Sequence, residues 1–202
     1  MENPGFWQQV KLVSSSANYW IIIFPPLLIA VLITLLILDQ IFPYDINLIV
    51  SRDDVLATKN VLEELALYAT AGFCILCLLR YLYSKDKFFL WASGMMMVLF
   101  FRELHPPISS AGVYVLLLML FYIAYKKYHI FADYIRNKYL VTLLGVGFFT
   151  YVLAVSTDER VWMFVPGEMI FHTKLEETLE LLGHISIGCA LLFATRKTPE
   201  NN

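Results

Sequence analysis

Long apolar runs separated by short polar stretches make up most of the chain. Six of these runs read as helices: Tyr19–Leu38, Val61–Leu82, Phe88–Leu104, Ile108–Tyr125, Tyr139–Ser156 and Thr173–Ala194. A helix needs about 20 apolar residues to cross a bilayer. The pattern therefore predicts an all-α, polytopic membrane protein, a bundle of six transmembrane helices.

Two proline pairs modify this pattern. Pro25-Pro26 is expected to kink the first run or divide it near its start, and Pro106-Pro107 stops the short third run. The third run can then be read as a half-length helix that ends inside the protein. The chain is expected to divide into an interfacial N-terminal segment (1–18), a six-helix membrane domain (19–194) and a tail (195–202).

Composition supports the bilayer as the main solvent. Hydrophobic residues make up 59% of the chain and charged residues only 16%, against about 25% charged in soluble domains. The net charge is −2 and no basic block is present, so nothing indicates nucleic-acid binding. The three cysteines, Cys74, Cys77 and Cys189, lie inside apolar runs, which favours packing roles over disulfides.

The charges of the loops orient the expected helices. Lysine and arginine gather after the second run, after the fourth run and in the tail, whereas the alternate loops are acidic. The positive-inside rule then places both termini in the cytoplasm. An even number of spans agrees with this orientation.

Ionisable residues crowd at three helix ends that this topology brings to the outer face. They cost about 2.5–3.5 kcal/mol each at membrane depth, so their retention favours a functional site. The residues that open or close these runs are Glu63, Glu64, Arg102, Glu103, His105, His172, Glu176, Glu177, Glu180 and His184.

Some of these glutamates have a structural interpretation. Asn60-x-x-Glu63 and Thr173-x-x-Glu176 have the spacing of capping boxes, in which the glutamate bonds back to the N-cap amide. That explanation does not extend to Glu64, Glu177, Glu180 or His184.

The last run carries the most suggestive spacing. Glu177, Glu180 and His184 share one helical stripe, and Glu180 and His184 are four residues apart. This spacing allows two side chains to ligate one ion. A carboxylate–imidazole hydrogen bond between helices and a proton relay are the alternatives that remain open. Gly188 continues the stripe and is expected to allow another backbone to approach closely.

Two resemblances follow from the motifs. Phe101-Arg102-Glu103-Leu104-His105 and Glu176-Glu177-x-x-Glu180 resemble R-E-L-x-x-H-like and E-E-x-x-E signatures of small six-helix bacterial inner-membrane proteins, although His105 here is only two residues after Glu103. This resemblance implies a multi-pass inner-membrane location but no particular activity. Glu63-Glu64, Phe101-x-x-x-His105 and His184 also resemble, in order, the motifs of CAAX-processing and bacteriocin-processing intramembrane proteases. Tyr68 and Gly188 depart from that family's arginine and Asn/Asp positions.

These observations lead to a functional hypothesis. His105, Glu180 and His184 are expected to hold a divalent metal, zinc or iron, and Glu64 or Glu177 to act as general base for a metal-bound water. Arg102 is expected to stabilise negative charge on the substrate. This describes a membrane-embedded metallohydrolase acting on a lipid or membrane-presented peptide. An ion- or proton-coupled transporter and a non-catalytic assembly subunit are the alternatives.

Overall fold

All regular structure in the described part of the chain is helical. The computed structural model describes residues 4–41, 52–104, 110–165 and 168–196, and it has no strand within them. The helices are α1 (Phe6–Ser16), α2 (Tyr19–Ile41), α4 (Arg52–Ser84), α5 (Lys87–Glu103), α6 (Ser110–Lys126), α7 (Tyr128–Ile135), α8 (Lys138–Asp158) and α9 (Glu168–Leu192). The all-α prediction is therefore confirmed.

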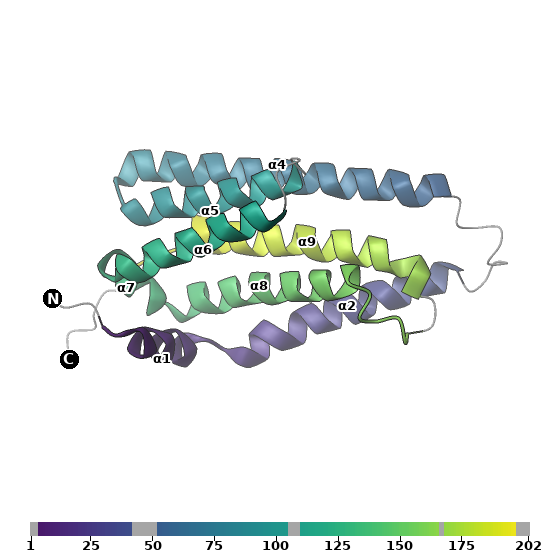
Figure 1. Cartoon of the computed structure of the whole chain (residues 1–202), viewed down its shortest axis with the longest axis horizontal. Coiled ribbons are helices and arrows are strands. Elements are labelled where there is room, and N and C mark those ends of the chain that lie inside the picture. Colours follow the sequence, from purple (N-terminus) through teal and green to yellow (C-terminus); the bar gives the residue numbers. More distant parts are fainter. Residues whose placement is uncertain (1–3, 42–51, 105–109, 166–167, 197–202) are drawn as a thin grey trace.

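The long helices lie side by side as a bundle (Figure 1). Helix α9 packs between α4 and α8, while α5 packs on α4 and α2 packs on α8. The short helices α1 and α7 lie at the same end of the bundle as the end of α9. Helix α9 is thus the central element, and residues on it can reach partners on several neighbours.

Three helices are long and apolar enough to cross a membrane. The candidate spans are Tyr19–Ile37, Val61–Ser84 and Lys138–Asp158, and a fourth is possible if α6 and α7, bent by 90° at their junction, count as one. Only 6% of the α2 span is buried inside the bundle, and Trp20 and Leu36 are 82% and 62% exposed. Apolar surface of this extent fits lipid rather than water as its surroundings.

Helices α5 and α6 form a hairpin shorter than the rest of the bundle. Each has 17 residues, about 25 Å of helix against a hydrocarbon core of about 30 Å. In Figure 1 the tip of the hairpin lies beside the middle of α4, short of the end that α4 and α9 reach. Helix α5 thus delivers its last residues, Arg102 and Glu103, to the interior of the bundle.

The two expected capping boxes are wrong. Helix α4 begins at Arg52 and α9 at Glu168, so Asn60 and Thr173 lie inside helices and are not N-caps. A capping box marks a helix start only where the preceding residues are not helical, and here they continue the helix. Helix α2 also runs through Pro25-Pro26 without being divided.

Glycines allow close contact between α8 and α9. A Cβ at Gly147 would lie 2.5 Å from Cγ1 of Ile187 and 3.2 Å from the carbonyl oxygen of Gly183. Gly188 also allows a close contact, since a Cβ there would lie 2.2 Å from the ring of Phe73. The neighbour is therefore a side chain and not the backbone that was expected. Small residues let membrane helices approach in this way.

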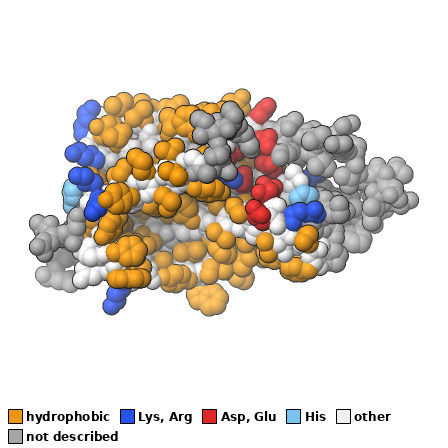
Figure 2. Space-filling view, in the orientation of Figure 1, with side chains coloured by type: hydrophobic (Ala, Val, Ile, Leu, Met, Phe, Trp, Pro, Cys, Tyr) orange, Lys and Arg blue, Asp and Glu red, His pale blue; other side chains and the backbone are white. Residues whose placement is uncertain are grey.

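Charged side chains separate along the bundle. Figure 2 shows Lys and Arg mainly at the end that carries α1 and α7, and Asp and Glu in a band across the bundle level with the hairpin tip. At the basic end Asp86 caps α5 by accepting the Phe88 N–H at 3.0 Å. Asp86 also accepts the Tyr134 hydroxyl at 2.5 Å and an Arg196 Nη2 bond at 2.6 Å.

These contacts set the ionisation of Asp86. Partial burial raises the pKa of its carboxyl, but the hydrogen bonds from Tyr134, the Phe88 N–H and Arg196 outweigh that effect and bring the pKa below its ordinary value of 3.8. Because Arg196 follows α9, this contact ties the end of the last helix to the start of α5. Arg80 adds a bond of 3.0 Å to the Ala194 carbonyl.

Candidate functional site

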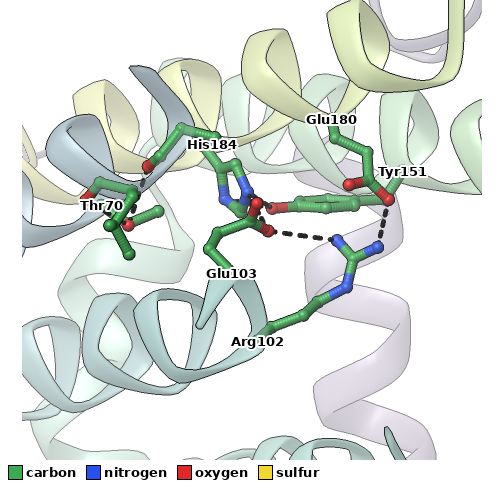
Figure 3. A network of polar contacts seen from close by, with 8 residues as sticks. Thr70, Arg102, Glu103, Tyr151, Glu180 and His184 are labelled. Atoms are coloured by element: carbon green, nitrogen blue, oxygen red, sulfur yellow. Dashed lines mark hydrogen bonds and ion pairs between the residues drawn. The ribbon is translucent and has the colours of Figure 1, made fainter. Parts of the chain in front are cut away.

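A polar network occupies the centre of the bundle at the hairpin tip (Figure 3). Nε2 of His184, on α9, lies 2.8 Å from Oε1 of Glu103, the last residue of α5. The other ring nitrogen of His184, Nδ1, is hydrogen-bonded to the hydroxyl of Tyr151 on α8. The side chains of His184 and Glu103 are 0% and 3% exposed. Three helices therefore meet through one continuous hydrogen-bonded chain.

Arg102 joins a second carboxylate to the network. Its Nη2 forms an ion pair with Oε1 of Glu180, and its Nη1 lies 3.9 Å from Oε1 of Glu103. The guanidinium also lies over the ring of Tyr151, 5.2 Å from the centroid. Arg102 Nη1 is buried and has no hydrogen-bond acceptor among the described residues. Arg102 therefore contacts both glutamates and the aromatic ring from one position.

Among the described residues of the network, the formal charges sum to −1 when the imidazole is neutral. Arg102 contributes one positive charge, whereas Glu103 and Glu180 contribute two negative charges. Burying an excess negative charge in a low-dielectric interior is costly.

The network lies well inside the bundle along the length of α8. Helix α8 has 21 residues, about 31 Å, which matches the hydrocarbon core of a bilayer. Tyr151 is about 20 Å from the start of α8 and about 10 Å from its end at Asp158. The site therefore lies about two helical turns from the end of α8 on the acidic side of the bundle.

Backbone packing positions Tyr151. A Cβ at Gly183 would lie 3.1 Å from the ring of Tyr151 and 3.4 Å from the Gly147 carbonyl oxygen. Because Gly183 has no side chain, the ring lies against α9 and its hydroxyl reaches His184, the next residue. On another side of His184, Thr70 of α4 is fully buried (Figure 3) and donates its hydroxyl to the Ala66 carbonyl at 2.8 Å.

The structure brings together some of the expected site residues. Arg102, Glu180 and His184 are all in the network, but Glu180 contacts Arg102 while His184 contacts Glu103 and Tyr151. Glu177 is buried, 6% exposed, three residues before Glu180, and Glu64 is exposed on α4.

The four histidines of the chain differ in where they lie. His184 is in the network, and His105, the other expected histidine ligand, lies outside the described residues. His172 is partly exposed near the start of α9, and His129 is exposed on α7. Within the described ranges no group of three His, Cys, Asp or Glu side chains is arranged to hold a metal ion.

The sequence-based hypothesis gives no catalytic or metal-binding role to two members of the network, Glu103 and Tyr151. Glu103 is expected only among the ionisable residues at the helix ends, and Tyr151 lies within the apolar run Tyr139–Ser156. A tyrosine in the middle of a membrane helix is a usable signal, because its hydroxyl needs a partner when it is buried.

Comparisons with family models, with curated proteins and with solved structures find no match to this chain. The two resemblances inferred from the motifs therefore stay predictions, and the site must be interpreted from its own chemistry.

Proposed function

We propose that this protein is a multi-pass membrane protein whose central network binds and releases a proton, and that it acts as a proton-coupled transporter. The observation that carries this proposal is the chain Glu103–His184–Tyr151 beside the Arg102–Glu180 ion pair. It is buried, it crosses three helices, and its formal charges leave room for one proton.

The hydrogen-bonding groups of the chain suit both protonation states. In the neutral state His184 donates Nε2–H to Glu103 and accepts the Tyr151 hydroxyl at Nδ1. In the protonated state Nδ1–H donates to the tyrosine oxygen, which rotates its own hydrogen away. Because both ring nitrogens of His184 keep a partner in either state, the proton can enter and leave without leaving the buried imidazole unsatisfied.

The surrounding helices provide an element that can respond to this proton. Arg102 and Glu103 are consecutive at the tip of the short α5–α6 hairpin, and their partners are on α8 and α9. Loss of the proton would leave a net negative charge at this junction and weaken the attachment of the hairpin. Half-length and broken helices of this kind carry coupling-ion sites in secondary transporters.

The proposal includes a topology. We propose that the six apolar runs are the membrane helices and that both termini lie in the cytoplasm. The basic residues near α1, α7 and the end of α9 support this orientation. A hairpin returns to the side of the membrane from which it entered. The position of the termini is therefore the same whether α5 and α6 each cross the whole membrane or enter it only part of the way. We place the protein in a bacterial inner membrane with the acidic band outside.

A pH-jump experiment tests the proposal directly. Reconstituted protein on a solid-supported membrane should give a transient current when the pH is changed, since a proton that binds at this depth moves charge within the membrane. Glu103→Gln and His184→Gln should remove the current, and His129→Gln, at an exposed position, should retain it. Absence of a wild-type current, or equal currents in all variants, overturns proton binding at this site.

A membrane-embedded metallohydrolase is the second candidate. It is favoured by the meeting of Glu103 and His184 at 2.8 Å, with His105 two residues beyond Glu103 in the sequence. Zinc or iron in stoichiometric amount in tag-free protein, lowered by His105→Ala and His184→Ala but not by His129→Ala, would support this function instead. Elemental analysis separates the two candidates because a proton site needs no metal.

A further inference from the structure

A second feature, at the basic end of the bundle, is an apolar groove of about 620 Å³. Helices α1, α6, α7 and α8 form most of its walls, with contributions from the start of α2 and from Phe88 and Trp91 of α5. It is separate from the polar network, since none of the network residues lines it. The groove is therefore not explained by the proposed transport site.

The groove runs along the direction of the long helices. On α8 its lining extends from Leu140 to Phe148, nine residues with a rise of about 12 Å. Residues of α1 and α7, the short helices at the basic end, also line it. The groove is therefore oriented like a lipid acyl chain, which extends from the headgroup region toward the middle of the bilayer.

Helix α1 lines the groove with apolar side chains that stay partly exposed, although the Phe6 ring packs edge-to-face on Tyr125 of α6. Phe6, Val10 and Val13 line the groove and remain 54%, 41% and 39% exposed. Their burial would be favourable by about 25 cal/mol per Å² of apolar surface, but the protein leaves them open. An apolar occupant from the bilayer would cover them.

Basic residues lie next to residues that line the groove. Tyr125 lines it, and Nζ of Lys126 lies 5.9 Å from the centroid of that ring. The lining residues Ile135 and Leu140 bracket Arg136 and Lys138 in the sequence, and Lys11 lies between Val10 and Val13. The acidic side chain nearby on α7 is Asp133, which is 3.9 Å from Arg136. The headgroup end is thus basic while the interior is apolar.

From this combination we infer that the groove binds one acyl chain of an anionic phospholipid, whose phosphate lies among the lysines at the rim. Basic residues at a membrane surface attract anionic lipids, and the groove adds shape to that attraction. The rim residues act on the headgroup, whereas Phe121, Leu144 and Phe148 contact the chain.

Lipid retention measured by native mass spectrometry tests the charge component. Protein is exchanged into phosphatidylglycerol or phosphatidylcholine with identical acyl chains, and the lipid that stays bound is counted. We expect one phosphatidylglycerol to be retained in preference. Lys126→Gln/Lys127→Gln should weaken this retention about tenfold. Lys85→Gln/Lys87→Gln removes the same charge from exposed positions at the junction of α4 and α5, which lies at the same end of the bundle, and should change the retention little.

Photocrosslinking of the wild-type protein tests the position of the chain. Phosphatidylglycerol with a diazirine at the end of one acyl chain should label peptides of α6 and α8 that line the groove. Equal loss of lipid in the two double variants, no preference over phosphatidylcholine, or adducts only on the outer faces of α2 and α4 would each overturn the inference. Crosslinks between two copies of the chain through α1 would assign the groove to a protein partner instead.

Discussion

Glu103 and His184 are 81 residues apart in the sequence, yet their side chains lie 2.8 Å from each other at the centre of the bundle. Their meeting depends on the length of α5, which ends at Glu103 and so places this carboxylate inside the protein. The proposed transport function depends on the properties of this pair, and four of the expectations below concern it or the helices around it.

The first expectation concerns the strength of the pair. Glu103→Leu or His184→Leu leaves one buried polar group without its partner, so each should lower the free energy of unfolding by about 3 kcal/mol or more. The double variant removes both groups and should cost less than the sum of the single losses. Reversible unfolding in mixed micelles measures this cycle. Additive losses would show that the two side chains are not coupled.

Tyr151→Phe separates the hydroxyl from the ring. The ring can still lie under Arg102, but His184 loses the partner of Nδ1, so we expect a loss of about 1–3 kcal/mol. The pH-jump current should also fall, because the protonated imidazole then has no acceptor on that side. Tyr139→Phe, at an exposed position, is the matched control, and a normal current in Tyr151→Phe would exclude this hydroxyl from the proton site.

Gly147→Ala should separate α8 from α9. The added Cβ would lie 2.5 Å from Ile187 and 3.2 Å from the Gly183 backbone oxygen, so a helix must shift and stability should fall by about 1–3 kcal/mol. Gly72→Ala is the control, since a Cβ there meets nothing within 4 Å and alanine favours the helix. Thermal unfolding curves that rank the two variants in the opposite order would contradict this account of the interface.

The basic end should respond to acid through Asp86. Its pKa is lowered in the folded protein, so its ion pair with Arg196 contributes stability above about pH 4 and loses it as the pH falls through the folded pKa. Asp86→Asn keeps a capping oxygen for Phe88 but removes the charge. The melting temperatures of wild type and variant should differ at pH 6 and converge on acidification. A constant difference would assign the effect to capping alone.

Cysteine labelling in intact cells tests the topology. Lys87, Lys127 and Asp158 are exposed, which makes them suitable positions. Cysteines at the first two should be protected from an impermeant reagent, and a cysteine at Asp158 should react. The reverse pattern would place the acidic band in the cytoplasm.

The sequence was sufficient to predict the helices of the bundle. Uninterrupted apolar runs identify α2, α5, α6 and α8 because burial in lipid needs little more than apolarity and length. The predicted helix starts at Asn60 and Thr173 are wrong. The capping-box spacing is present at both positions, but the residues before them are themselves helical, so α4 and α9 begin further upstream. The amphipathic helices α1 and α7 were not anticipated as helices, since they are too short and too mixed to stand out from a polar segment.

The site was predicted only in part. The stripe of Glu180 and His184 on α9 follows from helical geometry, but which partner each side chain takes depends on where neighbouring helices end. Glu103 reaches His184 because α5 stops after 17 residues, and Arg102 takes Glu180 because it is one residue away from Glu103. These contacts between helices depend on tertiary structure and cannot be read from the residue spacing within either helix.

The short α5–α6 hairpin has a consequence for how the protein is made. In the proposed topology its tip carries Arg102 and Glu103 into the membrane, but their partners Glu180 and His184 are synthesised about eighty residues later. Until α9 emerges from the ribosome, the charged side chains at this tip lack their partners on α9, so their insertion into lipid is unfavourable. The hairpin should therefore stay near the translocon, or in its aqueous vestibule, and complete its insertion only when the last helix arrives. Truncation before α9 should leave a chain that membrane quality-control proteases degrade.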